Sequence, residues 1–516
     1  MSENLIVINA DLGETRAALV ENGIIVELLL ERRDERSIVG NVYRGHVVRI
    51  LPGMQAAFVD IGLDRNAFLH VSDLLWTDGP DGEENGNGTD LEEPEETTRT
   101  GRASRRTPIR DVIKEGDSII VQCSKGPIST KGARVTAHVS LAGRHLVYMP
   151  TADRGGVSRR ISSDGERSRL AQILKRIRPK AGALIARTAA EGASADALAS
   201  DAEYLWETWT AIKSRYGEKQ KPGLLYEELE LPLRVARDRL GDSVARLVVD
   251  DPDQYKKIYD FVDRLMPSRL DSIALYKGDE PVFDAFGIES EIKRALDRRV
   301  ELPSGGSLII DQAEALTAID VNTGKFVGKG SRDHEETILI TNLEAVDEIA
   351  YQLRFRNIGG LIVLDLIDMD RPSSRKKVLE RLKKHLGADR AKASVIRISE
   401  FGLVEMTRQR TSDSLGRTLH EACPHCDGTG QILSRVTVAN EALREIKRRA
   451  DEFKGNIELV VHPNVAEVFL GSGSAPLKKL ESNIGRKVIL TPDSGIHQEL
   501  FKLKAERLGR KGKEEG

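Results

Sequence analysis

Two segments that lie far apart in the chain each carry polar side chains that could do chemistry next to an apolar run. In the first, residues 318–324 (AIDVNTG), Asp320 and Asn322 share one face of an expected strand, because alternate residues of a strand point to the same side. Val321 then points into the core. A carboxylate supported by an amide suits the binding of a hard cation.

The second segment, residues 359–370 (GGLIVLDLIDMD), predicts a strand buried on both faces that ends at Asp365, with Asp368 and Asp370 just beyond it. One helix separates the two segments, so their strands should be neighbours in one sheet, with Asp320 beside Asp365. Carboxylates so close repel each other unless something positive holds them. Mg²⁺ prefers oxygen ligands, binds one or two carboxylates together with phosphate oxygens, and can activate water. The alternative is that these acids cap helices or pair with Arg and Lys.

A different metal chemistry is indicated by residues 423–430 (CPHCDGTG), where Cys423 and Cys426 form a CxxC pair followed by glycines. This spacing is typical of half of a tetrahedral zinc site. The only other cysteine is Cys123, so either a histidine such as His425 completes the site or two chains each contribute a pair across a two-fold axis. A redox role needs a thioredoxin-like context, which we do not find in the sequence. Buried structural thiols are the remaining interpretation.

Phe58 and Phe68 lie on consecutive β-rich runs joined by a tight polar turn, and we expect them side by side on one sheet face. Aromatic rings interleaved with bases on an oligonucleotide-binding barrel form a stacking platform for single-stranded nucleic acid. The alternative is that both rings belong to a core, which is common for phenylalanine. The basic and histidine residues around them in the sequence are Arg44, His46, Arg65, His70 and Lys131.

The last candidate is residues 185–192 (IARTAAEG), where Arg187 and Thr188 come at the end of a short apolar strand. An arginine beside a hydroxyl group can hold a terminal phosphate through a bidentate contact and one further hydrogen bond. The motif is short, and an ordinary surface arginine is the alternative.

The elements that must position these residues follow from the sequence pattern. Residues 39–75 contain short β-rich runs broken by Pro52 and Gly53, and residues 117–126 resume them, as in a small antiparallel barrel. Residues 77–108, first acidic and then arginine-rich, have almost nothing to bury and read as a disordered excursion from a barrel loop.

After residue 300, strands and helices alternate, which predicts an α/β layer. A helix from about Glu335 to Arg356 separates the two acidic segments. A compact α/β tail follows from residue 436 onward. Residues 127–300 mix short strands with long helical runs.

Composition limits the class of protein. A chain of 516 residues should form about three to five domains. The net charge of −3 does not by itself suggest a nucleic-acid partner. The N-terminus carries Glu3 and lacks a basic region, and no apolar run approaches the ~18 residues that a membrane span needs. Three cysteines do not make a disulfide framework. We therefore expect a cytosolic protein without a membrane span.

Occurring together and in this order, these features resemble the ribonuclease E/G family of bacterial endoribonucleases, over residues 1 to about 516. The agreement of many long strings is far more specific than any one motif. No long scaffold follows the last expected domain, so the chain resembles the shorter members of the family. The strings are MQAAFVDIGLDRNAFLHV, VSLAGRHLVYMP, GGVSRRI, TAIDVNTG, EETILITNLEAVDEIAYQLRFRNIGGLIVLDLIDM, FGLVEMTRQR and CPHCDGTG.

The resemblance implies a multidomain α/β fold. It consists of a split ribonuclease H-like fold with an inserted S1 (OB) β-barrel and 5′-sensor domain, a DNase I-like catalytic domain, a zinc link and a small α/β C-terminal domain. The implied boundaries are 1–38 and 233–297 for the ribonuclease H-like parts, 39–137 for the barrel with its insertion 77–108, 138–232 for the sensor, 298–418 for the catalytic domain, 419–431 for the zinc link and 432–516 for the small domain.

By matching motifs, the resemblance implies that Asp320 and Asp365 bind the catalytic Mg²⁺ and that Asn322 places the scissile phosphate or its water. It also implies that Cys423 and Cys426 bind one structural Zn²⁺ together with the same residues of a second chain.

Phe58, Phe68 and Lys131 would fall on the RNA-binding face of the barrel. Lys392 stands where the family commonly has arginine, so it keeps the charge of that residue but loses the fork of a guanidinium. The residues implied to bind a 5′-monophosphate are Gly143, Val147, Arg187, Thr188 and Lys392.

The function implied is Mg²⁺-dependent cleavage of single-stranded RNA in rRNA and tRNA processing and mRNA decay. Metal-activated water would leave 5′-phosphate and 3′-hydroxyl ends, with a preference for 5′-monophosphorylated substrates. The implied partners are single-stranded RNA and a second copy of the chain, with a pair of such dimers left open. The competing class is a non-catalytic RNA-binding or ribosome-associated scaffold, and a metal phosphatase or DNase is a third.

Overall fold

The computed structural model divides into two compact units, Met1–Gly416 and Arg417–Gly516, which we describe separately. The insertion expected at 77–108 lies outside the described residues, apart from Pro108. The residues described are 4–10, 13–33, 36–74, 108–127, 131–241, 243–324, 331–387, 389, 391–399, 403–410, 413–471 and 474–505.

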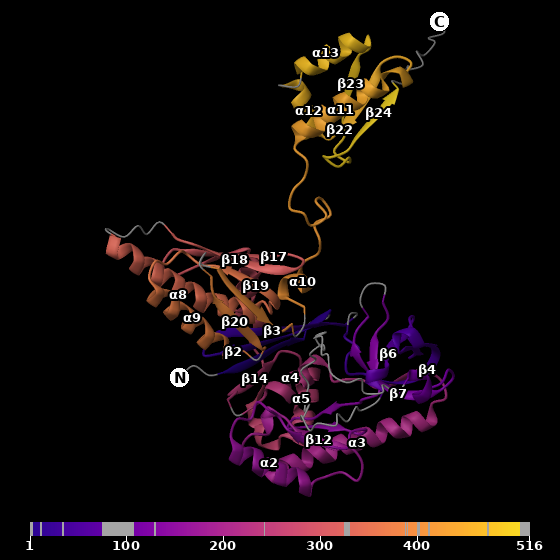
Figure 1. The fold of residues 1–516 in the computed structure, drawn as a ribbon, viewed down its shortest axis with the longest axis vertical. Helices are drawn as coiled ribbons and strands as arrows, with labels where there is room; N and C mark the ends of the chain where they lie inside the picture. The colour runs from indigo at the N-terminus through magenta and orange to yellow at the C-terminus, as the bar shows by residue number, and fades with distance from the viewer. Residues whose placement is uncertain are drawn as a thin grey trace. The chain divides into compact units, whose positions relative to one another are not determined.

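The N-terminal strands form one sheet with two strands from the middle of the chain (Figure 1). Strand β1 (Leu5–Ala10) lies between two neighbours. Strand β14 (Arg246–Val249) runs parallel to β1, whereas β2 (Glu14–Glu21) runs antiparallel to β1. Helices α4 (Leu231–Arg239) and α5 (Pro252–Leu265) share a core with this sheet. The order across the sheet is β15 (Ile273–Leu275), β14 (Arg246–Val249), β1 (Leu5–Ala10), β2 (Glu14–Glu21) and β3 (Ile24–Arg32).

The β-rich runs after β3 form the expected small barrel. Strand β7 pairs back with β4 and closes the circle, and β13 (Gly223–Tyr226) adds to the outer edge of β4. Gly45 is required where β4 crosses the interior, because a Cβ there would lie 2.5 Å from a methyl group of Val59. The closed order is β4 (Val42–Leu51), β5 (Ala56–Asp60), β6 (Ala67–His70), β8 (Arg134–Thr136) and β7 (Ser118–Lys125), with the short helix α1 (Ile109–Val112) before β7.

The barrel leads into a small sheet covered by two helices, α2 (Asp164–Arg176) and α3 (Ala195–Glu218). Ser163 and Ser194 begin these helices, because each hydroxyl accepts a hydrogen bond from a backbone N–H group of the first turn. The order across this sheet is β11 (Gly156–Val157), β12 (Ala183–Ala186), β10 (Leu146–Met149) and β9 (Leu141–Ala142).

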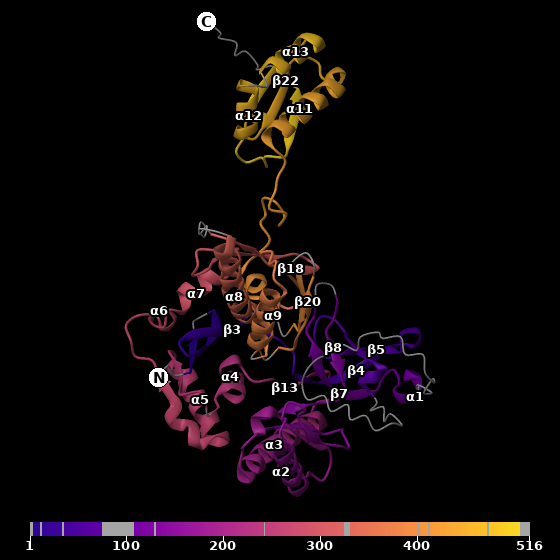
Figure 2. The ribbon, with the colours of Figure 1, turned by 60° about the vertical axis from the view of Figure 1, so that its left-hand side comes forward.

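The α/β layer expected after residue 300 is a six-stranded sheet. Helices α8 (Ser331–Phe355) and α9 (Pro372–Leu386) pack side by side on it (Figures 1 and 2). The order across the sheet is β16 (Arg299–Glu301), β17 (Ser307–Gln312), β18 (Leu316–Asn322), β19 (Gly360–Asp365), β21 (Leu403–Arg408) and β20 (Ala393–Ile398); α6 (Val282–Ala285) and α7 (Ile288–Leu296) precede it and α10 (Leu415–Leu419) follows.

Strand β19 is buried on one face only, so the prediction that both faces are buried is wrong. Ile362 and Leu364 are fully buried in the core with α8 and α9, whereas Leu361, on the other face, is 44% exposed. Asp365 belongs to the same exposed face as Leu361. A run of apolar residues cannot distinguish one buried face from two when the open face is itself partly apolar. We call this side of the six-stranded sheet, which carries Leu361 and Asp365, the open face.

The second unit has the expected α/β pattern. Strand β22 (Ile457–Val461) lies between the parallel β23 (Val488–Pro492) and the antiparallel β24 (Phe501–Ala505). The helices that share its core are α11 (Arg435–Arg449), α12 (Pro463–Leu470) and α13 (Ser474–Ile484). Among the described residues of both units, we find no helix with the length and apolar character needed to cross a membrane.

Candidate active site

Asp320 and Asp365 lie opposite each other at the ends of two neighbouring parallel strands. β18 and β19 pair with Asp320 in register with Asp365, and neighbouring strands are about 4.8 Å apart. Their preceding residues, Ile319 and Leu364, are buried at 1% and 0% exposure, so both carboxylates project from the open face. The juxtaposition expected from the sequence is therefore present, and the metal role of the pair stays a prediction.

Asn322 supports this pair of carboxylates. Its Nδ2 donates a hydrogen bond to Oδ2 of Asp320 at 2.7 Å, while Val321 between them is buried. The alternation of a strand thus produces the shared face of Asp320 and Asn322. Within the part of the chain that the structure describes, neither Asp320 nor Asp365 forms an ion pair with Arg or Lys.

The donor set fits a hard divalent cation. Two carboxylates and a nearby amide offer only oxygen ligands, and the open face admits the waters that Mg²⁺ retains. No cage of three or more Asp, Glu, His or Cys side chains is found among the described residues. A site built on two carboxylates therefore suits an ion that draws its remaining ligands from water and from a phosphate.

The CxxC pair lies in a tight turn of the second unit. The N–H group of Gly430 donates to the Sγ of Cys426 (N to Sγ, 3.3 Å) and, together with Gly428, lowers the pKa of this thiol although burial opposes the effect. Asp427 and both glycines have positive φ, which turns their backbone toward the sulfur. Cys423 is exposed, and Cys426 is half-buried. This geometry favours a thiolate, the form that binds zinc.

The two barrel aromatics lie directly opposite each other. Phe58 of β5 pairs with Phe68 of β6, and their rings meet edge to face with centroids 6.4 Å apart. Phe58 is 37% exposed and Phe68 half-buried, so neither ring belongs to the barrel core. Lys131 is exposed and stands three residues before β8, the neighbour of β6. Arg44, by contrast, stacks on Tyr216 and donates to its carbonyl, which makes it a structural residue.

The structure brings most of the expected phosphate-binding residues together. Arg187 follows the last residue of β12, and its Nη1 donates to the carbonyl of Gly143 at 2.6 Å. Val147 of the neighbouring strand β10 is buried and pairs with Ile185. Thr188 is exposed next to Arg187. Arg187 therefore has a defined position at a strand end, as expected.

Lys392 comes from a different layer. It immediately precedes β20 in the six-stranded sheet, where its carbonyl accepts a hydrogen bond from Gln409, and its side chain is exposed. Arg187 follows a strand of the other sheet, so the joint role of the two residues in phosphate binding stays a prediction.

Sequence reasoning missed two acids in this region, of which Asp201 is buried and Asp238 is half-buried. Asp201 of α3 is 2% exposed and accepts hydrogen bonds from three consecutive backbone N–H groups, those of residues 144–146, at 2.7–2.9 Å. Asp238 of α4 accepts a hydrogen bond from Arg187 at 2.8 Å. Asp201 fixes the loop that follows Gly143. Position 143 requires glycine, because a Cβ there would lie 2.4 Å from the carboxylate of Asp201. Neither acid is signalled by its neighbours in the sequence, because both sit inside helices.

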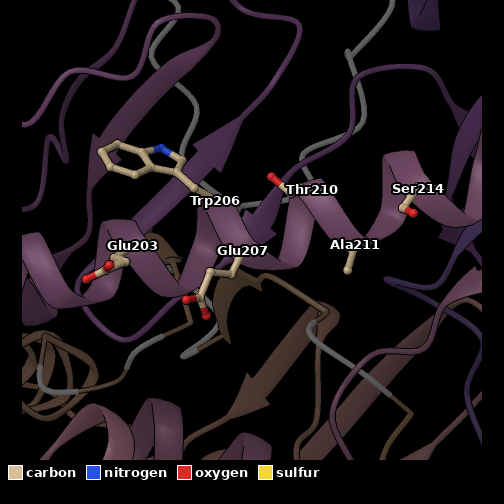
Figure 3. A pocket seen from close by; sticks show the side chains of 6 residues that line it. All are labelled: Glu203, Trp206, Glu207, Thr210, Ala211 and Ser214. Carbon is tan, nitrogen blue, oxygen red and sulfur yellow. The ribbon is translucent and has the colours of Figure 1, made fainter.

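A shallow cavity of about 520 Å³ lies elsewhere, on α3 (Figure 3). Its lining residues all come from this one helix, and none is a predicted site residue. They are Glu203, Trp206, Glu207, Thr210, Ala211 and Ser214.

Comparison with known proteins defines the class of this chain. The family model described as the Ribonuclease E/G family matches residues 140–411, which include the Arg187 region and both strand-end aspartates. A second model, described as the RNase E/G thioredoxin-like domain, matches residues 422–507. The chain therefore belongs to the ribonuclease E/G family.

Individual relatives agree with this assignment. Ribonuclease G of Escherichia coli (strain K12) is 42% identical over 500 residues, which cover 96% of this chain and 98% of that protein. Ribonuclease G of Haemophilus influenzae is 41% identical over 502 residues, with the same coverage. Ribonuclease E of Escherichia coli (strain K12) is 37% identical over 485 residues, which cover 93% of this chain and 44% of that protein.

The second family model corrects one expectation. A thioredoxin-like context is present, contrary to the prediction from the sequence. The CxxC pair nevertheless lies in a turn before α11, which begins only at Arg435, and not at a helix N-terminus that would activate a redox thiol. Zinc binding by the CxxC pair stays a prediction.

Proposed function

We propose that the chain is a Mg²⁺-dependent endoribonuclease that hydrolyses single-stranded RNA where β18 and β19 end. Membership of the ribonuclease E/G family makes it an endoribonuclease, and the proposal adds the site and the metal. One observation carries it. Asp320 and Asp365 stand in register on the open face without an ion pair among the described residues. Two carboxylates side by side on neighbouring strands repel each other unless a cation joins them.

Each residue has a distinct task in this proposal. Asp320 and Asp365 hold Mg²⁺, which when bound neutralises charge on the phosphate and activates water. Asn322 restrains Asp320 through its hydrogen bond and directs its remaining amide oxygen toward the substrate or its water. The water oxygen bonds to phosphorus, the bond from phosphorus to O3′ breaks, and O3′ takes up a proton. The products are a 5′-phosphate and a 3′-hydroxyl end.

The barrel and the residues around Arg187 would hold the RNA strand. Phe58 and Phe68 offer a ring pair for stacking bases, and Lys131 offers a charge for the backbone. Arg187 and Thr188 would bind a 5′-monophosphate beside Gly143 and Val147, with Lys392 as an additional charge. These contacts make single-stranded RNA with a 5′-monophosphate the preferred substrate.

Cys423 and Cys426 would bind one structural Zn²⁺ with the same pair of a second chain. The lowered pKa of Cys426 supports this role. Replacing both cysteines by serine should release zinc and reduce the mass measured by light scattering to that of the smaller species. An unchanged mass after complete loss of zinc would contradict the shared site.

The decisive assay for function compares three substrates in one buffer. A 5′-monophosphorylated A/U-rich RNA, its 5′-hydroxyl counterpart and duplex DNA are incubated with Mg²⁺ and, separately, with EDTA. We expect RNA cleavage only with Mg²⁺, faster on the 5′-monophosphate, and no cut in the DNA. RNA binding without any cleavage would indicate a scaffold protein, and cleavage of duplex DNA would indicate a different nuclease class.

A further inference from the structure

A buried asparagine on α8 grips the loop that follows Asp365. Asn342 is 0% exposed, and both ends of its amide contact the backbone of a single loop residue, Ile367. The N–H of Ile367 donates to Oδ1 of Asn342 at 3.1 Å, and Nδ2 of Asn342 donates to the carbonyl of Ile367 at 2.8 Å. Ile367 lies two residues after Asp365. The side chain therefore fixes the backbone immediately beyond a proposed metal ligand.

A buried acid on the same helix fixes the far end of this loop. Glu335 is 8% exposed and accepts hydrogen bonds from the backbone N–H groups of Asp370 and Arg371, both at 3.3 Å. The hydroxyl of Ser374 donates to it at 3.1 Å. Burial opposes ionisation, but these three hydrogen bonds outweigh it and lower the pKa of Glu335. The N-terminus of α9 is thus tied to α8.

Apolar side chains also anchor the loop, one just before the first attachment and one between the two. Leu366 and Met369 are each 3% exposed and belong to the core shared with α8 and α9. The carbonyl of Met369 accepts a hydrogen bond from Arg375 at 2.7 Å. The loop is therefore held at five of the six residues from Leu366 to Arg371. Such restraint is more than the packing of a surface loop requires, because polar anchors in a core carry a desolvation cost.

We infer that Asn342 is a positioning residue that orients Asp365 for the metal. This inference rests on the metal role proposed for Asp365. Asn342 acts through its two hydrogen bonds to the backbone of Ile367. Loss of these hydrogen bonds would let the end of β19 move relative to Asp320. Groups behind a metal ligand typically contribute about 10–100-fold to metal affinity or activity.

The test measures metal binding directly, on the full chain and without RNA. Mg²⁺ is titrated calorimetrically into wild type and N342A, and a fluorescent RNA is bound separately in EDTA. We expect a Kd for Mg²⁺ raised by at least ~10-fold in N342A and RNA affinity within twofold of wild type. N342D keeps an oxygen that accepts from the Ile367 N–H, but it places a carboxylate oxygen next to the Ile367 carbonyl, where wild type has a donor. We therefore expect an intermediate loss of Mg²⁺ affinity.

The matched control is T341V. Thr341 is the preceding residue, is 3% exposed, and its hydroxyl donates within α8 to the carbonyl of Thr337, not to the loop. We expect T341V to lower the thermal midpoint without changing the Kd for Mg²⁺. If N342A destabilises the fold as T341V does and binds Mg²⁺ like wild type, the positioning role is wrong. If N342A does not fold, wild-type Mg²⁺ affinity in a folded N342D overturns the inference just as well.

The variant D365N distinguishes a failure of this inference from a failure of the proposed metal role of Asp365. Loss of Mg²⁺ binding in D365N with wild-type binding in N342A overturns the positioning role alone. Retained binding in D365N overturns the metal site and, with it, the inference about Asn342.

Discussion

Two regions of the molecule differ in their electrostatic state. One is the edge of the sheet where β18 and β19 end, with Asp320 and Asp365, and the other is the Arg187 cluster, formed by Arg187, Gly143 and Asp238. At the edge, Asp320 and Asp365 face solvent, and among the described residues no cation pairs with either. In the Arg187 cluster, Arg187 already donates to Asp238 at 2.8 Å and to the carbonyl of Gly143 at 2.6 Å. In the proposed function the first region gains its cation from the metal, while Arg187 already has a carboxylate partner.

This difference explains why the two regions should respond differently to mutation. Asp238 is shared with Arg237, which is 5% exposed and also pairs with Glu228. Because Arg187 already has hydrogen-bond partners of its own, its attraction for a phosphate is weaker than that of an unpaired arginine. A cation at the edge relieves repulsion outright. We therefore expect the edge to determine whether cleavage occurs and the Arg187 cluster to change its rate.

The largest effect should come from the edge. D320N or D365N should reduce cleavage to the level seen in EDTA while RNA affinity stays near wild type, because an amide cannot replace the charge that holds Mg²⁺. Gel-based cleavage and fluorescence binding measure the two effects. The matched control is D311N on the neighbouring strand β17, because Asp311 is held by Arg298. Normal cleavage by D365N would contradict the expected difference between the edge and the Arg187 cluster.

A smaller effect is expected at the Arg187 cluster. R187Q should lower the preference for 5′-monophosphorylated over 5′-hydroxyl RNA by about 10-fold, near the low end for a charge-assisted hydrogen bond, because Asp238 already offsets the guanidinium. The ratio of kcat/KM on the two RNAs measures this preference. Cleavage of the 5′-hydroxyl RNA should not change. If both substrates are cut more slowly by the same factor, Arg187 has a structural role only.

The smallest effect concerns stability and pH. Burial opposes ionisation of Asp238, but Arg237 and Arg187 outweigh it and lower its pKa from 3.8 to about 2. A lowered folded pKa stabilises the protein above about pH 4, and this contribution is lost as the pH falls through about 2. The difference in unfolding free energy between wild type and D238N should be constant from neutral pH to about 5 and shrink between about 4 and 2. Denaturant titrations at several pH values test this. A difference that does not depend on pH would show that Asp238 is not a charged partner of Arg187.

The sequence was sufficient where spacing along one strand decides the geometry. Asp320, Val321 and Asn322 alternate as a strand requires, and one intervening helix was enough to place Asp365 beside Asp320. The pairing of Phe58 with Phe68 follows from the short turn between their strands.

The sequence was not sufficient where the partner comes from another element. Asn342 and Asp238 are ordinary polar residues in helices until the fold brings Ile367 and Arg187 to them. The one-sided burial of β19 depends on which face α8 and α9 cover, and an apolar run does not encode that choice. The supporting groups of a site are therefore harder to predict than its ligands.

The most direct test of the account is a crystal structure of the protein soaked with Mn²⁺, which replaces Mg²⁺ and scatters anomalously. The account predicts an anomalous peak about 2.1 Å from one carboxylate oxygen of each of Asp320 and Asp365. An ion bound elsewhere in crystals of active enzyme, with these two carboxylates unliganded, would contradict it.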